Sequence, residues 1–461
     1  MTKDEMEAEV IARLRPDEEE KKYILSIAEK IIDTIKEVSN RQSMMVGSVA
    51  RDTFIRGDQD LDIFIFFDED TPREILEEEG LRIANSVVNT MGGEGIGKFA
   101  EHPYIHALID GMKVDLVPCY AVPDASMIKS AVDRTPFHTR YIISRIGNLT
   151  DDVLLFKQFV KAGGIYGSDL ATGGFSGYLC ELLVLFYGGF DQVIDAASGE
   201  WLPGYKIDIE RHGINEFEDP LIVIDPVDPG RNVAASLSLD KMCTFIELAV
   251  LYNNKPDKSF FFRKKEVHVS PDEFKCHLHK RGTKLYAITF PTPHYPEDTI
   301  VPQLRRSCNS IVNLLEKNEF NVNRADCIMQ EDECMIVVEI ITDRLPSLKR
   351  HTGPPVWNRT NAKKFCDKYL MENCCAGPYI KEGKYVVEIE RKYVYARELL
   401  FSEELKNIGH GKHIRIALEK GWNVFLDEDC YRKPFCQFLN DFLLKVSSGI
   451  SIQREWSGDD I

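Results

Sequence analysis

The chain of 461 residues carries 74 acidic and 57 basic side chains, which gives a net charge of −17 at pH 7 and argues against nucleic-acid binding over its whole surface. Its length and 44% hydrophobic content predict two to four domains with real cores. No run approaches the roughly 18 uncharged apolar residues of a membrane span. The polar start at Met1-Thr2-Lys3-Asp4-Glu5 does not have the pattern of a signal peptide, so we expect a cytoplasmic protein. The 12 cysteines form no CxxC pair, which favours reduced thiols over a zinc site.

The first 140 residues predict a small mixed α/β domain. Apolar residues recur at spacings of three and four between Glu18 and Val38, which predicts a helix. The apolar residues 44–46 precede a Gly47-Ser48 turn, and the apolar run at 61–67 predicts a strand. The segment Thr71-Pro72-Arg73-Glu74 predicts the start of another helix, with Thr71 as its N-cap.

Two carboxylates stand at the start of the second of these strands. Asp60 and Asp62 are two residues apart, so their side chains point to the same face of an extended chain. Neighbouring carboxylates repel each other unless a cation lies between them, and hard ions such as Mg²⁺ prefer oxygen ligands and often bring substrate phosphates. The Gly47-Ser48 turn opens a short helix whose backbone N–H groups can hold phosphate oxygens. Together these features predict metal-assisted nucleotide chemistry.

A hairpin supplies a third carboxylate. Runs at 105–109 and 112–117 flank Asp110-Gly111, a strong hairpin signal that makes Asp110 a turn residue. Asp115 lies within the second run, in an otherwise apolar stretch where a buried carboxylate needs a partner. A divalent ion shared with Asp60 and Asp62 would provide that partner.

The remainder of the chain changes character twice. Up to about residue 255 it looks mainly helical, and Thr150, Ser176 and Ser238 are the expected N-caps. Beyond that point strands alternate with helices, an order that suggests a ferredoxin-like α+β module. The strands are expected at 285–290, 335–341 and 384–390, and a helix at 303–316.

Four motifs resemble those of one family. They are Gly47-Ser48-Val49-Ala50-Arg51-Asp52-Thr53-Phe54-Ile55-Arg56-Gly57 with Asp60 and Asp62, Lys113-Val114-Asp115-Leu116-Val117-Pro118-Cys119-Tyr120, Asp133-Arg134-Thr135-Pro136-Phe137-His138, and Gly173-Gly174-Phe175-Ser176-Gly177-Tyr178-Leu179-Cys180-Glu181. A Gly-Ser turn, a paired-acid strand and a later strand acid are typical of polymerase-beta-like nucleotidyltransferases. The details resemble the class I, archaeal-type CCA-adding enzymes over residues 1–440. Members of that family add C, C and A to the 3′ end of tRNA from CTP and ATP, with Mg²⁺ and no nucleic-acid template.

The resemblance implies a multidomain α+β fold. Residues 1–145 would form a polymerase-beta-like catalytic head and residues 146–258 a helical domain that recognises the nucleotide base. Residues 259–461 would form a ferredoxin-like body and a tail that bind tRNA at its acceptor stem and elbow. Exposed apolar strands in the tail would also permit a homodimer.

The resemblance also assigns the reacting groups. Asp60, Asp62 and Asp115 match the catalytic, metal-binding triad, although the family often has Glu where this chain has Asp60. Asp115 is our choice for the general base on the primer 3′-hydroxyl, with Asp60 as the alternative. The alternative for all three is that they are ordinary acids at strand edges.

Seven residues match the family's contacts to the incoming nucleotide. They are Gly47, Ser48, Arg51, His138, Lys157, Tyr166 and Arg231. Arg231 resembles the arginine that reads the Watson–Crick edge of the base, because a guanidinium offers a planar fork of donors. Each has a structural alternative: a helix cap for Ser48, a solvent-exposed or loop arginine for Arg51 and Arg231, a hydrogen-bonded structural residue for His138, a snorkelling lysine for Lys157 and core packing for Tyr166.

A basic segment suits contact with RNA. Residues 341–400 carry 12 basic and 7 acidic side chains, interleaved with aromatic residues, whereas residues 1–100 carry 13 and 23. An ordinary solvated surface is the alternative. The basic residues best suited to RNA are Arg344, Lys349, Arg350, Arg359, Lys363 and Lys364.

Two other functions compete with CCA addition. One is an ATP-specific enzyme of the same superfamily, such as a poly(A) polymerase or an oligoadenylate synthetase. The other is a non-catalytic RNA-binding scaffold of the same fold. Nucleotide preference separates the first from CCA addition, and the presence of all three carboxylates argues against the second.

Overall fold

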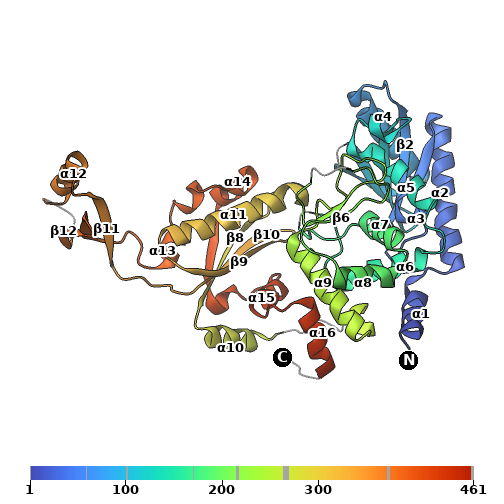
Figure 1. Cartoon of the computed structure of the whole chain (residues 1–461). Helices are drawn as coiled ribbons and strands as arrows, with labels where there is room; N and C mark the ends of the chain where they lie inside the picture. Colours follow the sequence, from blue (N-terminus) through green and yellow to red (C-terminus); the bar gives the residue numbers. More distant parts are fainter. Residues whose placement is uncertain are drawn as a thin grey trace. The chain divides into compact units, whose positions relative to one another are not determined.

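The computed structural model describes residues 2–457 apart from residues 59, 100–101, 170, 214–216, 263–268 and 371–373. The chain forms two compact units (Figure 1). Unit 1 comprises Met1–Lys265 together with Ser447–Ile461, and unit 2 comprises Glu266–Val446.

Unit 1 contains a five-stranded sheet with the order β1-β2-β5-β4-β3. The strands are β1 (Ser43–Val46), β2 (Asp60–Asp68), β3 (Glu94–Phe99), β4 (Pro103–Ile109) and β5 (Met112–Ala121). β2 and β5 are parallel, and the other neighbours are antiparallel. Helices α2 (Glu18–Ser39) and α4 (Arg73–Thr90) pack on one face, where alternate residues of β2 such as Leu61 and Ile63 are buried. The alternation leaves Asp60, Asp62 and Asp115 on the opposite face of the sheet.

The rest of unit 1 is mainly helical around an aromatic core. Phe156, Phe159, Phe175, Phe245 and Tyr252 are fully buried and meet one another edge to face or tilted. Its helices are α1 (Lys3–Leu14), α3 (Gly47–Ala50), α5 (Thr135–Ile143), α6 (Thr150–Ala162), α7 (Gly177–Tyr187), α8 (Phe190–Gly199), α9 (Leu239–Asn254) and α16 (Ser448–Ser457). Two short parallel strands, β6 (Tyr205–Ile207) and β7 (Leu221–Val223), complete it.

Unit 2 confirms the ferredoxin-like prediction. Its sheet has the order β14-β8-β10-β9 with all neighbours antiparallel, and the elements follow one another as strand, helix, strand, strand, helix, strand. These elements are β8 (Lys284–Pro291), α11 (Glu297–Lys317), β9 (Val322–Met329), β10 (Glu333–Ile340), α14 (Lys412–Lys420) and β14 (Asn423–Leu426). Helices α10 (Pro271–Arg281), α13 (Ala396–Leu400) and α15 (Cys436–Leu443) also belong to unit 2.

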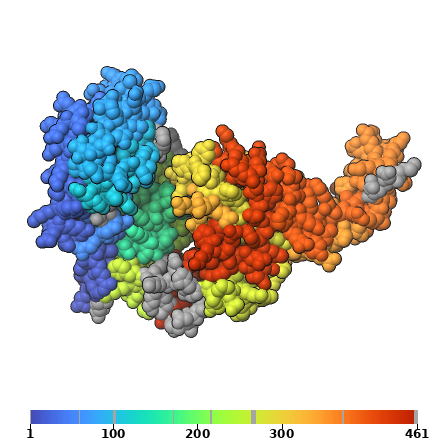
Figure 2. All heavy atoms as spheres, turned by 180° about the vertical axis from the view of Figure 1, so that it is seen from behind, coloured from blue at the N-terminus to red at the C-terminus, as the bar shows by residue number. Residues whose placement is uncertain are grey.

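A small module is inserted between β10 and α14. It has a three-stranded sheet of β11 (Leu348–Pro355), β13 (Lys384–Glu390) and β12 (Ala376–Lys381), with α12 (Arg359–Leu370) packed against it. Figure 2 shows its atoms, in orange, gathered apart from the yellow and red atoms of the four-stranded sheet of the same unit. Most of the basic residues predicted to contact RNA lie in this module.

Several local predictions are confirmed, and two are wrong. Asp110 and Gly111 have φ values of 49° and 78° and form the tight turn of the β4–β5 hairpin. Ser176 and Ser238 cap α7 and α9 through their side chains. Thr71, however, is not an N-cap, because its N–H is bonded in a turn to Asp68 and the helix begins one residue later, after Pro72. Thr150 is likewise the first residue of α6 rather than its cap.

None of the helices in the described part of the chain is by itself long and apolar enough to cross a membrane. Helices α7 and α8 reach that length and composition only when they are taken together, and they meet at an angle of 89°.

A buried carboxylate anchors the sheet of unit 2, and its loss should destabilise the protein. Arg281 donates two hydrogen bonds, of 2.6 and 2.9 Å, to Glu339, and Thr283 and Asn323 donate one each. Burial alone would raise the pKa of Glu339, but these bonds outweigh it and lower the pKa to about 2. The stabilisation that these hydrogen bonds give the folded protein is therefore fully present above the ordinary carboxyl pKa. It is lost as the pH falls from there toward 2, because Glu339 then becomes protonated.

We expect Glu339→Gln to lower the free energy of unfolding by about 2 kcal/mol at pH 7, because it removes the charge of a fully buried carboxylate that accepts hydrogen bonds from Arg281, Thr283 and Asn323. Glu404→Gln is the control, since it removes a more exposed ion pair with Lys392 and should change the melting temperature little. Equal melting temperatures for the two variants, measured by circular dichroism, would contradict this account.

Candidate active site

Strands β2 and β5 bring two of the predicted carboxylates together. They run parallel with Asp62 directly beside Asp115, and Asp60 lies two residues earlier on the same face. Burial, the negative charge of Asp115 and that of Asp60 together raise the pKa of Asp62 to about 7, although Arg51 opposes them. The site therefore concentrates negative charge in a place where a cation would be stabilising.

Gly47 makes room for one of these carboxylates. Its φ of 76° lies in the left-handed region, and a Cβ built there would be 2.0 Å from Oδ2 of Asp62. The position thus excludes every other residue, both by backbone conformation and by space. Ser48 follows it, half-buried, and its carbonyl oxygen accepts a hydrogen bond from the N–H of Thr53.

A histidine supports the third carboxylate. His106 lies opposite Asp115 across the β4–β5 ladder, and its Nδ1 is 2.5 Å from Oδ1 of Asp115. This contact fixes one carboxylate oxygen and leaves the other available.

The donor set fits a divalent cation. As they stand, no three acidic, histidine or cysteine side chains converge closely enough to hold an ion among the residues that the structure describes. The pKa of Asp62 is nevertheless raised, first by burial and then by repulsion from Asp115 and Asp60, and a bound cation would oppose these effects. Carboxylate oxygens are also the ligands that Mg²⁺ prefers. Asp60, Asp62 and Asp115 are the residues that would hold it.

Arg51 and Lys157 share one buried counter-ion. Glu181 of α7 is fully buried, and it forms ion pairs with Nε of Arg51 at 2.9 Å and with Nζ of Lys157 at 3.0 Å. Thr53 donates a hydrogen bond of 2.5 Å to the same carboxylate and accepts one from Lys157. Burial alone would raise the pKa of Glu181, but the charges of Lys157 and Arg51 outweigh it and lower the pKa. Neither the exposed arginine nor the snorkelling lysine considered from the sequence is observed.

Tyr166 lies beside this cluster. A Cβ built on Gly177 would be 3.1 Å from the Tyr166 hydroxyl and 3.7 Å from Nζ of Lys157, so both polar groups face the beginning of α7. Burial raises the pKa of Tyr166, which therefore stays a neutral hydroxyl. The structure thus brings Arg51, Lys157 and Tyr166 together, with Arg51 close enough to affect the pKa of Asp62.

His138 and Arg231 meet at another buried carboxylate. Nε2 of His138 lies 2.8 Å from Oδ2 of Asp225, and Nη1 of Arg231 donates to the same oxygen at 3.0 Å. His138 also stacks on Tyr178 at 4.0 Å between ring centroids. Arg51 reaches toward this cluster, since its Nη1 is 3.3 Å from the hydroxyl of Thr139.

The six basic residues predicted to contact RNA lie in unit 2. Lys349 and Arg350 are on β11, and Arg359, Lys363 and Lys364 are on α12. Lys349 is half-buried, whereas the others, including Arg344 before β11, are exposed. Their placement leaves the prediction open to test.

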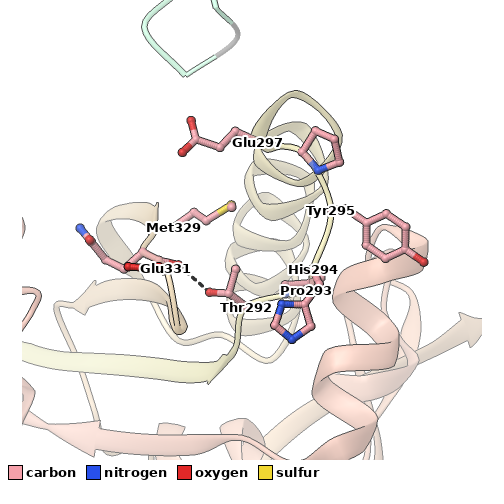
Figure 3. Close-up of a pocket in the computed structure, with 9 residues that line it drawn as sticks. Thr292, Pro293, His294, Tyr295, Glu297, Met329 and Glu331 are labelled. Atoms are coloured by element: carbon pink, nitrogen blue, oxygen red, sulfur yellow. Dashed lines mark hydrogen bonds between the residues drawn. The ribbon is translucent and has the colours of Figure 1, made fainter. Parts of the chain in front are cut away.

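Unit 2 contains an open hollow of about 580 Å³. It is formed by the β8–α11 connection and the end of β9, and it presents Glu297, Glu331, His294 and Tyr295 (Figure 3). Its described lining includes two carboxylates and no lysine or arginine, which is a poor match for a triphosphate.

Four residues of the site were not assigned roles from the sequence. Glu181 had a usable signal, because a single acid within the apolar run of α7 must have a buried partner. Asp225 had a similar signal, as an acid directly after an apolar strand. His106 and Tyr178 had none, because their partners are identified only by strand pairing and tertiary stacking.

The fold and this site define a polymerase-beta-like nucleotidyltransferase, a class that uses divalent metals. The family described as "Nucleotidyltransferase domain" matches residues 27–138. "tRNA nucleotidyltransferase, second domain" matches residues 151–262, and "CCA-adding enzyme, C-terminal domain" matches residues 281–427.

Relatives match over nearly the whole chain. A CCA-adding enzyme of Methanoregula boonei is 49% identical over 97% of this chain and 96% of its own length. Those of Methanosarcina mazei and Methanothermobacter thermautotrophicus are 40% and 37% identical, over 93% and 94% of this chain and 95% and 97% of their own lengths. The chain belongs to the family of CCA-adding enzymes.

Gly47→Ala should abolish most nucleotidyl transfer. The new methyl group would displace the Asp62 carboxylate, and a displacement of about 1 Å in a reacting group can cost roughly a hundredfold in rate. Gly57→Ala is a matched control, because Gly57 has a φ of 78° and nothing within 4 Å of its built Cβ. It carries the same backbone strain without the clash, so its turnover should stay within a few-fold of the parent protein. Equal turnover for both variants would show that the contact with Asp62 does not matter.

Proposed function

We propose that this chain builds and repairs the 3′-terminal CCA of tRNA, by adding C from CTP twice and then A from ATP. The observation that carries the proposal is the position of Arg51. Arg51 lies near the Asp62–Asp115 pair, which suits a metal ion, and near Lys157 and Tyr166, which suit phosphate. It also lies near His138, which with Arg231 suits the base, so all three groups belong to one site. Family membership over nearly the whole chain supports the same function.

The reaction is a displacement at the α-phosphorus. The 3′-hydroxyl of the tRNA forms a bond to that phosphorus, the bond to the bridging oxygen breaks, and pyrophosphate leaves. In this proposal Asp115 accepts the hydroxyl proton on the oxygen that His106 leaves available. Bound Mg²⁺ would neutralise phosphate charge and polarise the reacting oxygens.

The triphosphate is held by residues around the buried Glu181. Gly47 and Ser48 offer backbone and hydroxyl groups, and Arg51, Lys157 and Tyr166 offer charge and a hydroxyl donor. Glu181 neutralises only one of the two cations, so the cluster keeps a net positive charge for the substrate. His138 and Arg231 complete the nucleotide site.

Base choice depends on Arg231 together with phosphates of the tRNA. Its guanidinium donates to acceptors on the Watson–Crick edge, and no template strand is needed. Residues 1–145 act as the catalytic head, 146–258 as the base-recognition domain and 259–461 as the tRNA-binding part. The exposed basic residues of the inserted module suit the acceptor stem and elbow, which are recognised by shape and phosphate charge.

Incorporation tests the proposal directly. A tRNA transcript without its CCA end is incubated with Mg²⁺ and CTP, ATP, GTP or UTP singly, and then with CTP and ATP together. We expect two additions from CTP alone and a third only when ATP is also present. Long tails from ATP alone would favour a poly(A)-type polymerase, and no incorporation into any RNA would favour the scaffold.

The RNA surface has its own test. Lys363→Glu with Lys364→Glu should raise the KM for tRNA roughly tenfold and leave turnover nearly unchanged, because these side chains are expected to bind phosphate rather than reacting atoms. Lys22→Glu with Lys30→Glu, on the exposed face of α2, makes the same change in net charge elsewhere. An unchanged KM in the α12 variant, or an equal rise in both, would rule this surface out.

A further inference from the structure

Asp225 is a fully buried carboxylate surrounded by groups that face the nucleotide site. Besides His138 and Arg231, the N–H of Val227 donates to it at 3.1 Å, and the hydroxyl of Tyr178 donates at 3.4 Å. Burial alone would raise the pKa of Asp225, but the bonds from His138, Val227 and Arg231 outweigh it and lower the pKa. Asp225 therefore remains ionised and binds several donors in fixed directions.

Only one edge of Arg231 is used by this contact. Nη1 is bonded to Asp225, and no other hydrogen bond joins the guanidinium to the residues that the structure describes. The side chain of Arg231 is 38% exposed, whereas that of Asp225 is 0% exposed. The guanidinium is thus bonded to the buried Asp225 through Nη1, and its other donors remain available on the exposed side.

The loop that carries Arg231 is anchored independently. Arg134, just before α5, donates to Asp228 at 2.6 Å, and Asn232 bonds to the backbone of Leu221 and Val223. The loop backbone therefore has its own supports, and the bond to Asp225 acts mainly on the orientation of the arginine side chain.

We propose that Asp225 is a specificity-determining positioning residue, which orients the guanidinium of Arg231 toward the Watson–Crick edge of the incoming base. This inference rests on the proposed function. Cytosine N3 and adenine N1 are acceptors at that edge, whereas uracil and guanine have an N–H there. A guanidinium whose donors point in fixed directions therefore favours binding of C and A, and it disfavours U and G, whose N–H would face another donor. A guanidinium free to turn can instead reach O4 of uracil or O6 of guanine.

The test is the ratio of kcat/KM for CTP to that for UTP on a tRNA that lacks CCA. Asp225→Asn keeps the shape but removes the charge, and we expect the ratio to fall about tenfold or more. Asp228→Asn is the matched control, because it weakens an arginine contact in the same loop and should keep the ratio within about twofold. A general loosening of the loop would lower both ratios alike and would overturn the proposal.

A double-mutant cycle separates positioning from a structural role. If Asp225 acts through Arg231, Asp225→Asn should have no further effect on the ratio in an Arg231→Lys background. Additive losses would contradict the proposal. If Asp225→Asn fails to fold, Asp225→Glu keeps the charge but moves it by one methylene, and it should lower the ratio in the same way; an unchanged ratio would overturn the inference.

The two proposals fail in different ways. A parent protein that incorporates neither CTP nor ATP would remove the proposed function itself. A parent protein that selects CTP, together with an Asp225→Asn variant that selects it equally well, would remove only the role of Asp225.

Discussion

The ion pairs of Glu181 are the interaction on which the site of unit 1 depends. A fully buried carboxylate on α7 binds Arg51, which follows the short helix α3, and Lys157 of α6. Three segments far apart in the sequence are therefore fixed to one another by charge, at a place where an unpaired ion would be very unfavourable. Arg51 then stands between the carboxylates of the sheet and the groups around Asp225.

The carboxylates of the site differ in how their negative charge is balanced. Asp62 and Asp115 are two acids placed side by side, where His106 contacts Asp115 and the charge of Arg51 opposes the raised pKa of Asp62, whereas Glu181 and Asp225 each form ion pairs with arginine or lysine. The fold thus balances the charge of the Asp62–Asp115 pair only in part, as the raised pKa of Asp62 indicates, and pairs Glu181 and Asp225 directly with cations. A partly balanced pair of carboxylates suits a site whose cation arrives with the substrate, and cations held by a buried carboxylate suit groups that must keep one orientation.

Much of this arrangement could be predicted because its signals are local. Alternation along β2 places Asp60 and Asp62 on one face, Asp110-Gly111 specifies the hairpin that carries Asp115, and Ser176 marks the start of α7. Strand β3 was not predicted, since Gly95 and Gly97 interrupt any alternation. The partners of Glu181 and Asp225 could not be predicted either, because Thr53 and Glu181 are 128 positions apart and His138 and Asp225 are 87 positions apart.

The most direct measurement is a crystal structure of the protein with Mg²⁺, a non-hydrolysable CTP analogue and a tRNA acceptor stem that lacks CCA. Our account predicts metal bound by Asp60, Asp62 and Asp115, the triphosphate beside Ser48 and Arg51, and the cytosine edge facing Arg231. A nucleotide bound elsewhere, for example in the hollow beside Glu297 and Glu331, would contradict it.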